Sequence, residues 1–170
     1  MAINTTTHTD IKKLVRRDVC ELAPKMRLRV QAAESECSSK KVPVYIYECL
    51  RSNELAQIYY RLGSSRAPNG LRTWHFYGLA VDIVHPVEYW NAWPVWDSVE
   101  KRYIGGNEKW WKVVVEIFKR HGMDWGGDWA HFKDTPHFQW DRCKPSPSNL
   151  AVSLYKSGGV ISVWKAVGAD

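Results

Sequence analysis

Residues 73–82 read Thr-Trp-His-Phe-Tyr-Gly-Leu-Ala-Val-Asp, and they mark the point where a loop passes into a strand. His75 lies at the end of the loop, and residues 79–84 have the apolar, β-branched composition of a strand. The glycine between them permits a tight turn. Because side chains alternate faces along a strand, Ala80 and Asp82 share one face, which can turn the Asp82 carboxylate toward the His75 imidazole.

Imidazole and carboxylate groups are both zinc ligands, and catalytic zinc keeps three protein ligands and one open position. Alone, this pair is also typical of a partly buried histidine that is hydrogen-bonded to an aspartate. A second segment, residues 125–138, adds His137 as a third ligand candidate and Asp134 three residues earlier. The Thr-Pro between them favours an extended or turned backbone, so Asp134 can lie beside a metal rather than on it. From there its carboxylate can act as a general base.

The rest of the chain predicts helices and two further strands. Apolar spacing predicts helices over residues 10–22 (Thr9 or Asp10 as N-cap), from Pro24 onward and over 107–121, and Ser52 can cap another that ends near Gly63. Strands are predicted over 42–49 and 138–140, a loose end over 1–9, loops over 38–41 and 64–73, and a turn over 125–129. Residues 86–103 show no period, and 144–170 could form a last helix or strand. With no repeat or long linker, the chain reads as one α+β domain.

Composition narrows the class of protein. The 170 residues are 45% hydrophobic and 25% charged, which is typical of a soluble globular domain and argues against disorder. Most of the ten tryptophans should pack in the core, and a few could line a groove. The net charge of +6 favours anionic partners, but the basic residues form no stripe, so we expect no nucleic-acid partner. No stretch is apolar enough for membrane insertion, and the amino terminus shows no secretory signal, which predicts synthesis in a cytoplasm.

The four cysteines indicate neither a thiolate metal site nor a disulfide framework. Cys20, Cys37, Cys49 and Cys143 contain no Cys-x-x-Cys pair. A core of this size also needs no covalent staples. We expect buried or free thiols.

Taken together, the two segments resemble the zinc D-alanyl-D-alanine carboxypeptidases and phage L-alanoyl-D-glutamate endopeptidases, the VanY-like family. The family pattern Ser/Thr-x-His-x-x-Gly-x-Ala-x-Asp is matched by residues 73–82, and the later acidic-x-x-His pattern by Asp134 and His137 after the Gly-Gly-Asp-Trp turn at 126–129. Upstream, residues 48–52 resemble the family's Arg-Ser segment and contribute Arg51. The resemblance covers about residues 43–141. It departs at Asp134, where carboxypeptidase members commonly carry glutamate.

The resemblance implies an architecture and a set of roles. The fold would be α+β, a small antiparallel sheet flanked by helices, Hedgehog- and D-Ala-D-Ala-peptidase-like, with residues 1–170 as a single catalytic domain and no separate wall-binding domain. His75, Asp82 and His137 would hold one Zn²⁺ per chain, and Asp134 would be the general base. Arg51 would bind substrate and stabilise charge on the scissile carbonyl, so Arg51→Ala should leave thermal unfolding near wild type. Arg51 could instead simply pair with Glu48 or Glu54.

Four further residues near the motifs are candidates for contacts with the ligands or the substrate: Asp128, Trp129, His85 and His131. Histidines in such places are more often surface residues, and Asp128 could simply belong to its turn.

The function that the resemblance implies is that of a phage endolysin, a zinc peptidase that cuts the L-alanyl-D-glutamate bond of peptidoglycan stem peptides. The alternatives are a D-alanyl-D-alanine carboxypeptidase, a non-catalytic wall-binding module of the same fold and, outside this fold, a basic nucleic-acid binder. We expect a monomer that is made in the host cytoplasm and reaches the periplasmic wall after holin-type release.

Overall fold

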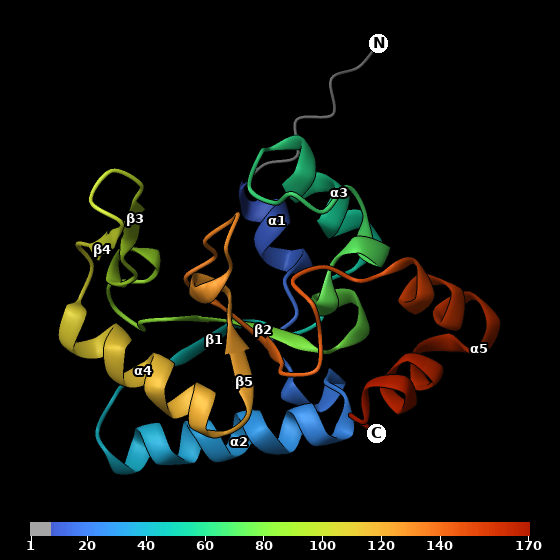
Figure 1. Ribbon diagram of the computed structural model, residues 1–170, viewed down its shortest axis with the longest axis horizontal. Coiled ribbons are helices and arrows are strands. Elements are labelled where there is room, and N and C mark those ends of the chain that lie inside the picture. Colours follow the sequence, from blue (N-terminus) through green and yellow to red (C-terminus); the bar gives the residue numbers. More distant parts are fainter. Residues whose placement is uncertain (1–7) are drawn as a thin grey trace.

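The computed structural model describes residues 8–170, in which helices surround a small central sheet (Figure 1). The expected loose end over residues 1–9 lies almost wholly outside this range. The helices are α1 (His8–Leu14), α2 (Pro24–Ser39), α3 (Asn53–Arg61), α4 (Glu108–Arg120) and α5 (Asn149–Val167). The strands are β1 (Tyr45–Glu48), β2 (Ala80–Val84), β3 (Val95–Asp97), β4 (Arg102–Ile104), β5 (Met123–Trp125) and β6 (His137–Trp140).

The central sheet is antiparallel, in the order β1-β2-β6-β5, and its register aligns three functional residues. Asp82 in the inner strand β2 lies opposite Glu48 of β1 on one side and opposite His137 of β6 on the other. Residues directly opposite one another in neighbouring strands point to the same face of a sheet. Glu48, Asp82 and His137 therefore form a row across one face.

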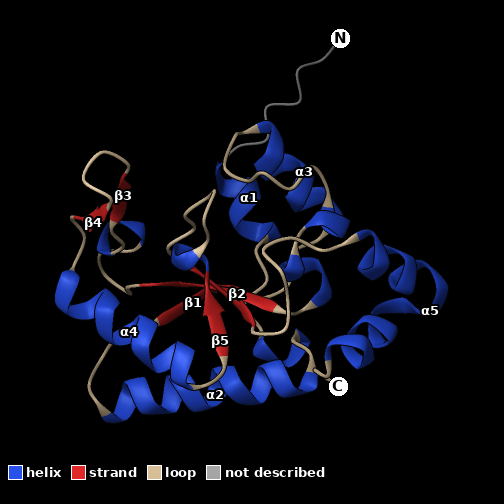
Figure 2. Ribbon diagram, viewed as in Figure 1, coloured by secondary structure: helices blue, strands red, loops and turns tan. Residues whose placement is uncertain are grey.

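Two long helices, α2 and α4, pack against each other and lie together along one side of the sheet (Figures 1 and 2). The α2 helix begins at Pro24, whose missing N–H costs nothing in the first turn. The α4 helix is capped by the Asn107 side chain, which accepts from the Trp110 N–H. Their buried residues join Val81 and Ile83, the β2 residues that alternate with Asp82, in the main core.

The tryptophans connect separate segments of the chain through hydrogen bonds from their indole N–H groups as well as through packing. Among the described residues, six of these groups donate to main-chain carbonyls at 2.6–2.8 Å, and they belong to Trp74, Trp93, Trp110, Trp125, Trp140 and Trp164. A buried indole N–H needs such a partner, because an unpaired polar group in the core is costly. The expectation that most tryptophans serve packing is confirmed by their burial, which includes Trp74, Trp93, Trp110, Trp111, Trp125 and Trp140.

The segment after β6 forms α5, which bends at Gly158 and Gly159. Its Trp164 donates to the carbonyl of Tyr77 at 2.7 Å, and the Lys144 carbonyl just before it accepts from Trp74 at 2.6 Å. Both contacts fall on the short turn that carries His75. The carboxyl-terminal segment therefore braces the candidate site, a role that the sequence did not suggest.

The α+β class with a small antiparallel sheet is confirmed, but some local predictions are wrong. The helix predicted over 10–22 is interrupted: α1 begins at His8, ahead of both predicted caps, and ends at Leu14, and a short 3-10 turn follows at Val19–Glu21. The Arg16 carbonyl accepts instead from the N–H of Cys49 at 2.7 Å, so a tertiary contact replaces the helical hydrogen bonds. The sequence predicts no helix or strand over residues 86–103, but the β3–β4 hairpin forms there. The sequence also does not predict β5, which leads into the expected turn at 125–129.

Within the described residues, none of the helices combines the length and apolarity that crossing a bilayer requires. The four cysteines are free, as expected, and Cys37, Cys49 and Cys143 are buried.

Candidate active site

Three side chains from separate elements meet at one point: His75, Asp82 and His137. His75 sits on a 3-10 turn, Trp74–Tyr77, that is closed by Gly78 in the left-handed region at φ 64°. A side chain at Gly78 would also come within 2.8 Å of the Glu21 carbonyl oxygen, so only glycine fits. The turn holds the imidazole beside the two residues that the sheet register already aligns.

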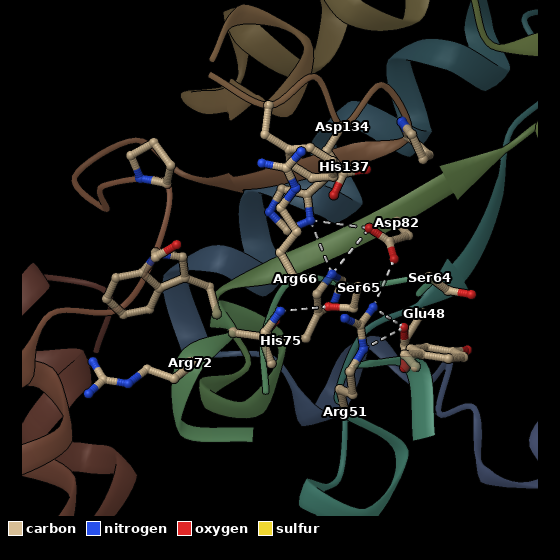
Figure 3. Close-up of a pocket in the computed structure, with 18 of the residues that line it drawn as sticks. Glu48, Arg51, Ser64, Ser65, Arg66, Arg72, His75, Asp82, Asp134 and His137 are labelled. Carbon is tan, nitrogen blue, oxygen red and sulfur yellow. Dashed lines mark hydrogen bonds and ion pairs between the residues drawn. The ribbon is translucent and has the colours of Figure 1, made fainter. Parts of the chain in front are cut away.

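The three facing atoms form a nearly equilateral triangle (Figure 3). The His75 Nε2 lies 3.1 Å from the Asp82 Oδ1 and 3.1 Å from the His137 Nδ1, and the third edge, between His137 Nδ1 and Asp82 Oδ1, is 3.2 Å. Ligand atoms about 2.0–2.1 Å from a tetrahedral zinc ion lie roughly 3.3–3.4 Å apart. The triangle is within about 0.2–0.3 Å of that spacing, so the donor set fits a zinc ion.

Hydrogen bonds behind the two rings fix which nitrogen of each histidine faces the triangle. The His75 Nδ1 lies 3.2 Å from the Cys49 carbonyl, which can only accept, so Nδ1 carries the hydrogen and Nε2 keeps a lone pair. The His137 Nε2 lies 3.3 Å from the Oε1 of Gln139. The Gln139 amide donates to the carbonyls of Cys143 and Lys144 at 2.9 and 3.0 Å, which sets its orientation. Both free lone pairs therefore point into the triangle, as metal binding requires.

Gln139 should therefore matter for metal affinity although it does not face the metal. We expect Gln139→Leu to weaken zinc binding about 10- to 100-fold, because the His137 ring loses the acceptor that fixes its orientation. Competition against a chelator of known affinity measures the change. Gln57→Leu, on the exposed side of α3, is the matched control. Unchanged affinity in Gln139→Leu would contradict this role.

The Asp82 carboxylate is held in its charged form. Burial opposes ionisation, but the His75 ring, the close contacts with the ring nitrogens of both histidines and the nearby Arg51 together keep the pKa of Asp82 well below its usual value. The Arg51 Nη2 lies 3.2 Å from the Asp82 Oδ2, the oxygen that the triangle does not use. Arg51 thus orients the ligand carboxylate.

Arg51 also forms a buried ion pair with Glu48, through Nε at 3.0 Å and through Nη2. The Glu48 side chain is fully buried, and its Oε1 has no hydrogen-bond partner among residues 8–170. Arg51 therefore pairs with Glu48, one of the two partners considered for it, and it also lines the cavity described below, so its role toward a substrate stays a prediction. The expectation that Arg51→Ala leaves unfolding unchanged does not fit this burial.

We expect Arg51→Ala to lower the free energy of unfolding by about 3–5 kcal/mol, because it leaves the Glu48 carboxylate buried without a counter-charge. Denaturant unfolding of the metal-free protein measures the loss. Arg61→Ala, at the exposed end of α3, removes the same charge and should change little. A wild-type unfolding free energy for Arg51→Ala would show that the pair contributes nothing to folding.

A cavity of about 720 Å³ opens beside the triangle, and all three candidate ligands line it. Asp134 lies on its wall, on the same side as His137 (Figure 3). None of the described residues donates a hydrogen bond to the Asp134 carboxylate, and burial raises its pKa, an effect that the nearby His137 opposes. A half-buried carboxylate with unused lone pairs and a raised pKa is suited to accept a proton.

The other candidates divide into one residue in the cavity and three outside it. Trp129 lines the cavity, and its ring lies 5.1 Å from that of His137. Asp128 instead pairs with Lys119 on the surface at 2.8 Å. His85 accepts main-chain hydrogen bonds in its own turn, and His131 is exposed. Neither these two histidines nor Asp128 lies among the cavity-lining residues.

Sequence reasoning missed several residues that the fold brings to the site. Gln139 lies two positions after His137 on the same strand, so alternation alone could have placed both on one face. Glu48 was considered only as a partner of Arg51. Arg66 and Phe132 lie in loops whose sequence gives no periodic signal, and only the folded chain brings them to the cavity.

Comparison with known proteins finds a matching family and several relatives. A family model of peptidase family M15, described as D-alanyl-D-alanine carboxypeptidase, matches residues 66–140. The chain is 31% identical over 125 residues to the peptidoglycan L-alanyl-D-glutamate endopeptidase CwlK of Bacillus subtilis, a match that covers 70% of this chain and 73% of that one. It is also 31% identical over 103 residues to the L-alanyl-D-glutamate peptidase of Listeria phage A118, covering 61% of this chain and 32% of that protein.

Among solved structures, the L-Ala D-Glu endopeptidase ChiX of Serratia marcescens has the same fold, with a TM-score of 0.53 and 22% identity. The likeness covers 80% of this chain and 95% of that one. The likeness to ChiX shows the fold, and the similarity to CwlK, together with the family match over residues 66–140, shows that the chain belongs to the M15 family of peptidases. The family resemblance drawn from residues 43–141 is confirmed.

Proposed function

We propose that this protein is a zinc endopeptidase that hydrolyses the L-alanyl-D-glutamate bond of peptidoglycan stem peptides. The observation that carries the proposal is the triangle of His75 Nε2, Asp82 Oδ1 and His137 Nδ1, with both imidazole tautomers fixed from behind and a cavity in front. The choice of bond is supported by the relatives, two of which are named for it.

His75, Asp82 and His137 would hold the ion. When bound, zinc supplies a Lewis acid that polarises a carbonyl and makes water more acidic. The protein's own part is to move protons and to hold charge. Asp134 would take a proton from the attacking water at its carboxylate and pass it to the leaving amine. Its carboxylate lies on the cavity wall and accepts no hydrogen bond from the part of the chain that the structure describes, which supports this role.

Arg51 would hold the oxygen of the scissile carbonyl. Its Nε and Nη2 donate to Glu48 and Asp82, whereas none of the described residues accepts a hydrogen bond from Nη1. A cationic donor that is fixed before the reaction stabilises negative charge as it develops. Arg51 would then have three roles: it would neutralise the buried Glu48, orient the Asp82 carboxylate and bind the substrate carbonyl.

Digestion of purified cell-wall sacculi tests the proposal. The zinc-loaded protein should release soluble fragments, a strong chelator should stop the release, and added zinc should restore it. Release that persists after complete removal of the metal would contradict a zinc mechanism. A protein that binds the wall without releasing fragments would support the non-catalytic module instead.

The similarity to a phage peptidase supports a role as an endolysin. Under this proposal the protein would be made in the host cytoplasm and would act as a monomer on the wall after holin-type release.

A further inference from the structure

Arginines are prominent on the cavity wall, and two of them are already engaged. Arg51 pairs with Glu48 and Asp82. Arg72 donates to the carbonyl of Pro147 at 3.4 Å and to the side chain of Asn149 at 2.9 Å. These two cations therefore hold parts of the protein in place.

Arg66 is the exception among the cavity-lining cations that the structure describes. Its guanidinium forms no hydrogen bond or ion pair with any of the residues from 8 to 170, and its contact is with the ring of Phe132, 4.3 Å from the ring centroid. A guanidinium that lies over an aromatic face keeps its in-plane N–H donors free. Arg66 thus presents an uncompensated cation with a fork of unused donors to the cavity.

The loop that carries Arg66 is anchored. The N–H groups of Ser64 and Ser65 donate to the Tyr59 carbonyl at the end of α3, at 2.9 and 3.2 Å. The Ser65 hydroxyl accepts from the N–H of Ala67 at 3.1 Å. Arg66 is therefore flanked by fixed backbone, which lowers the entropy that binding a ligand would cost.

The Arg66 side chain contacts the segment that contains Asp134, the proposed general base. Phe132, whose ring the Arg66 guanidinium contacts, lies two residues before Asp134, and both line the cavity. In Figure 3 the Arg66 side chain points toward the end of the cavity that holds His137 and Asp134. An anionic group bound by Arg66 would therefore lie in the same cavity as His137 and Asp134.

The proposed substrate carries such a group. A D-glutamyl residue has two carboxyl groups, and a peptide that continues through one of them leaves the other free, close to the scissile nitrogen. Resting on the proposed function, we infer that Arg66 binds this free carboxylate and makes the cavity select an acidic residue after the scissile bond. Bidentate pairing of guanidinium with carboxylate gives both geometry and charge recognition.

Two peptides that differ only in this group test the inference. One is an L-alanyl-D-glutamyl peptide with the free carboxylate, and the other carries a carboxamide in its place. The wild-type protein should cleave the carboxylate peptide with a kcat/KM about 10- to 100-fold higher. Arg66→Gln should lose that factor and cleave both peptides equally, and Arg66→Lys should keep part of the preference.

The control is Arg61→Gln, which removes an equal charge from an exposed position outside the cavity and should keep the full preference. Zinc content and the unfolding midpoint should match wild type in every variant. Arg66→Gln with an undiminished preference, or with equal losses on both peptides, would overturn the inference and leave the proposed function standing. Zinc-loaded wild-type protein that cleaves neither peptide would overturn both.

Discussion

Asp134→Asn is expected to slow peptide hydrolysis by about 10²–10⁴-fold while zinc stays bound. Asparagine keeps the shape of the side chain but cannot accept a proton from water. The Asp134 carboxylate lines the cavity, is not one of the three triangle groups and receives no hydrogen bond from the described residues. Turnover of a synthetic peptide, measured beside the zinc content of the same sample, separates chemistry from metal binding.

Asp128→Asn provides the matched control for this experiment. Asp128 lies six residues earlier, is exposed and pairs with Lys119, so its change should leave both zinc and turnover intact. Full activity in Asp134→Asn would remove the proton-transfer step from the mechanism. Loss of zinc in that variant would make Asp134 a ligand.

Asp82→Asn is expected to have the opposite pattern and the larger effect, with loss of zinc and of all zinc-dependent activity. A neutral amide is a poorer ligand for a dication than a carboxylate. The change also removes the charge that pairs with Arg51. Metal analysis after passage over a desalting column should find about one zinc per wild-type chain and little in the variant.

The comparison of these two variants tests the division of roles. Should Asp82→Asn keep its zinc while Asp134→Asn loses it, the ligand and the base are reversed. Should both retain zinc, the ion is bound elsewhere, and the triangle at His75 and His137 is not the metal site.

The sequence predicted the core of this site because its residues lie in short patterns with physical meaning. His75 and Asp82 flank a glycine that the structure needs at positive φ, and Asp82 occupies the strand face that alternation assigned to it. The pairing of Asp82 with His137 depends on sheet register, which the sequence did not predict, although it put His137 forward as a third ligand candidate.

What the sequence could not predict depends on contacts between distant segments. The Arg16 carbonyl accepts a hydrogen bond from the N–H of Cys49 instead of from the next helical turn. No local sequence pattern predicts this contact. The Gly-bent α5 braces the His75 turn through Trp164, yet its own sequence fits a helix or a strand equally well. Arg66 and Phe132 belong to two loops that are distant in sequence, and their contact on the cavity wall exists only in the folded chain.

The bond that is cut gives the most direct test of the central claim. Mass analysis of fragments released from sacculi by the zinc-loaded protein should find new amino termini on D-glutamate, with L-alanine left on the glycan side. That result would be expected from a zinc endopeptidase whose catalytic groups are His75, Asp82, His137 and Asp134. Release of free D-alanine with the L-alanyl-D-glutamate bond intact would contradict it and would indicate a carboxypeptidase.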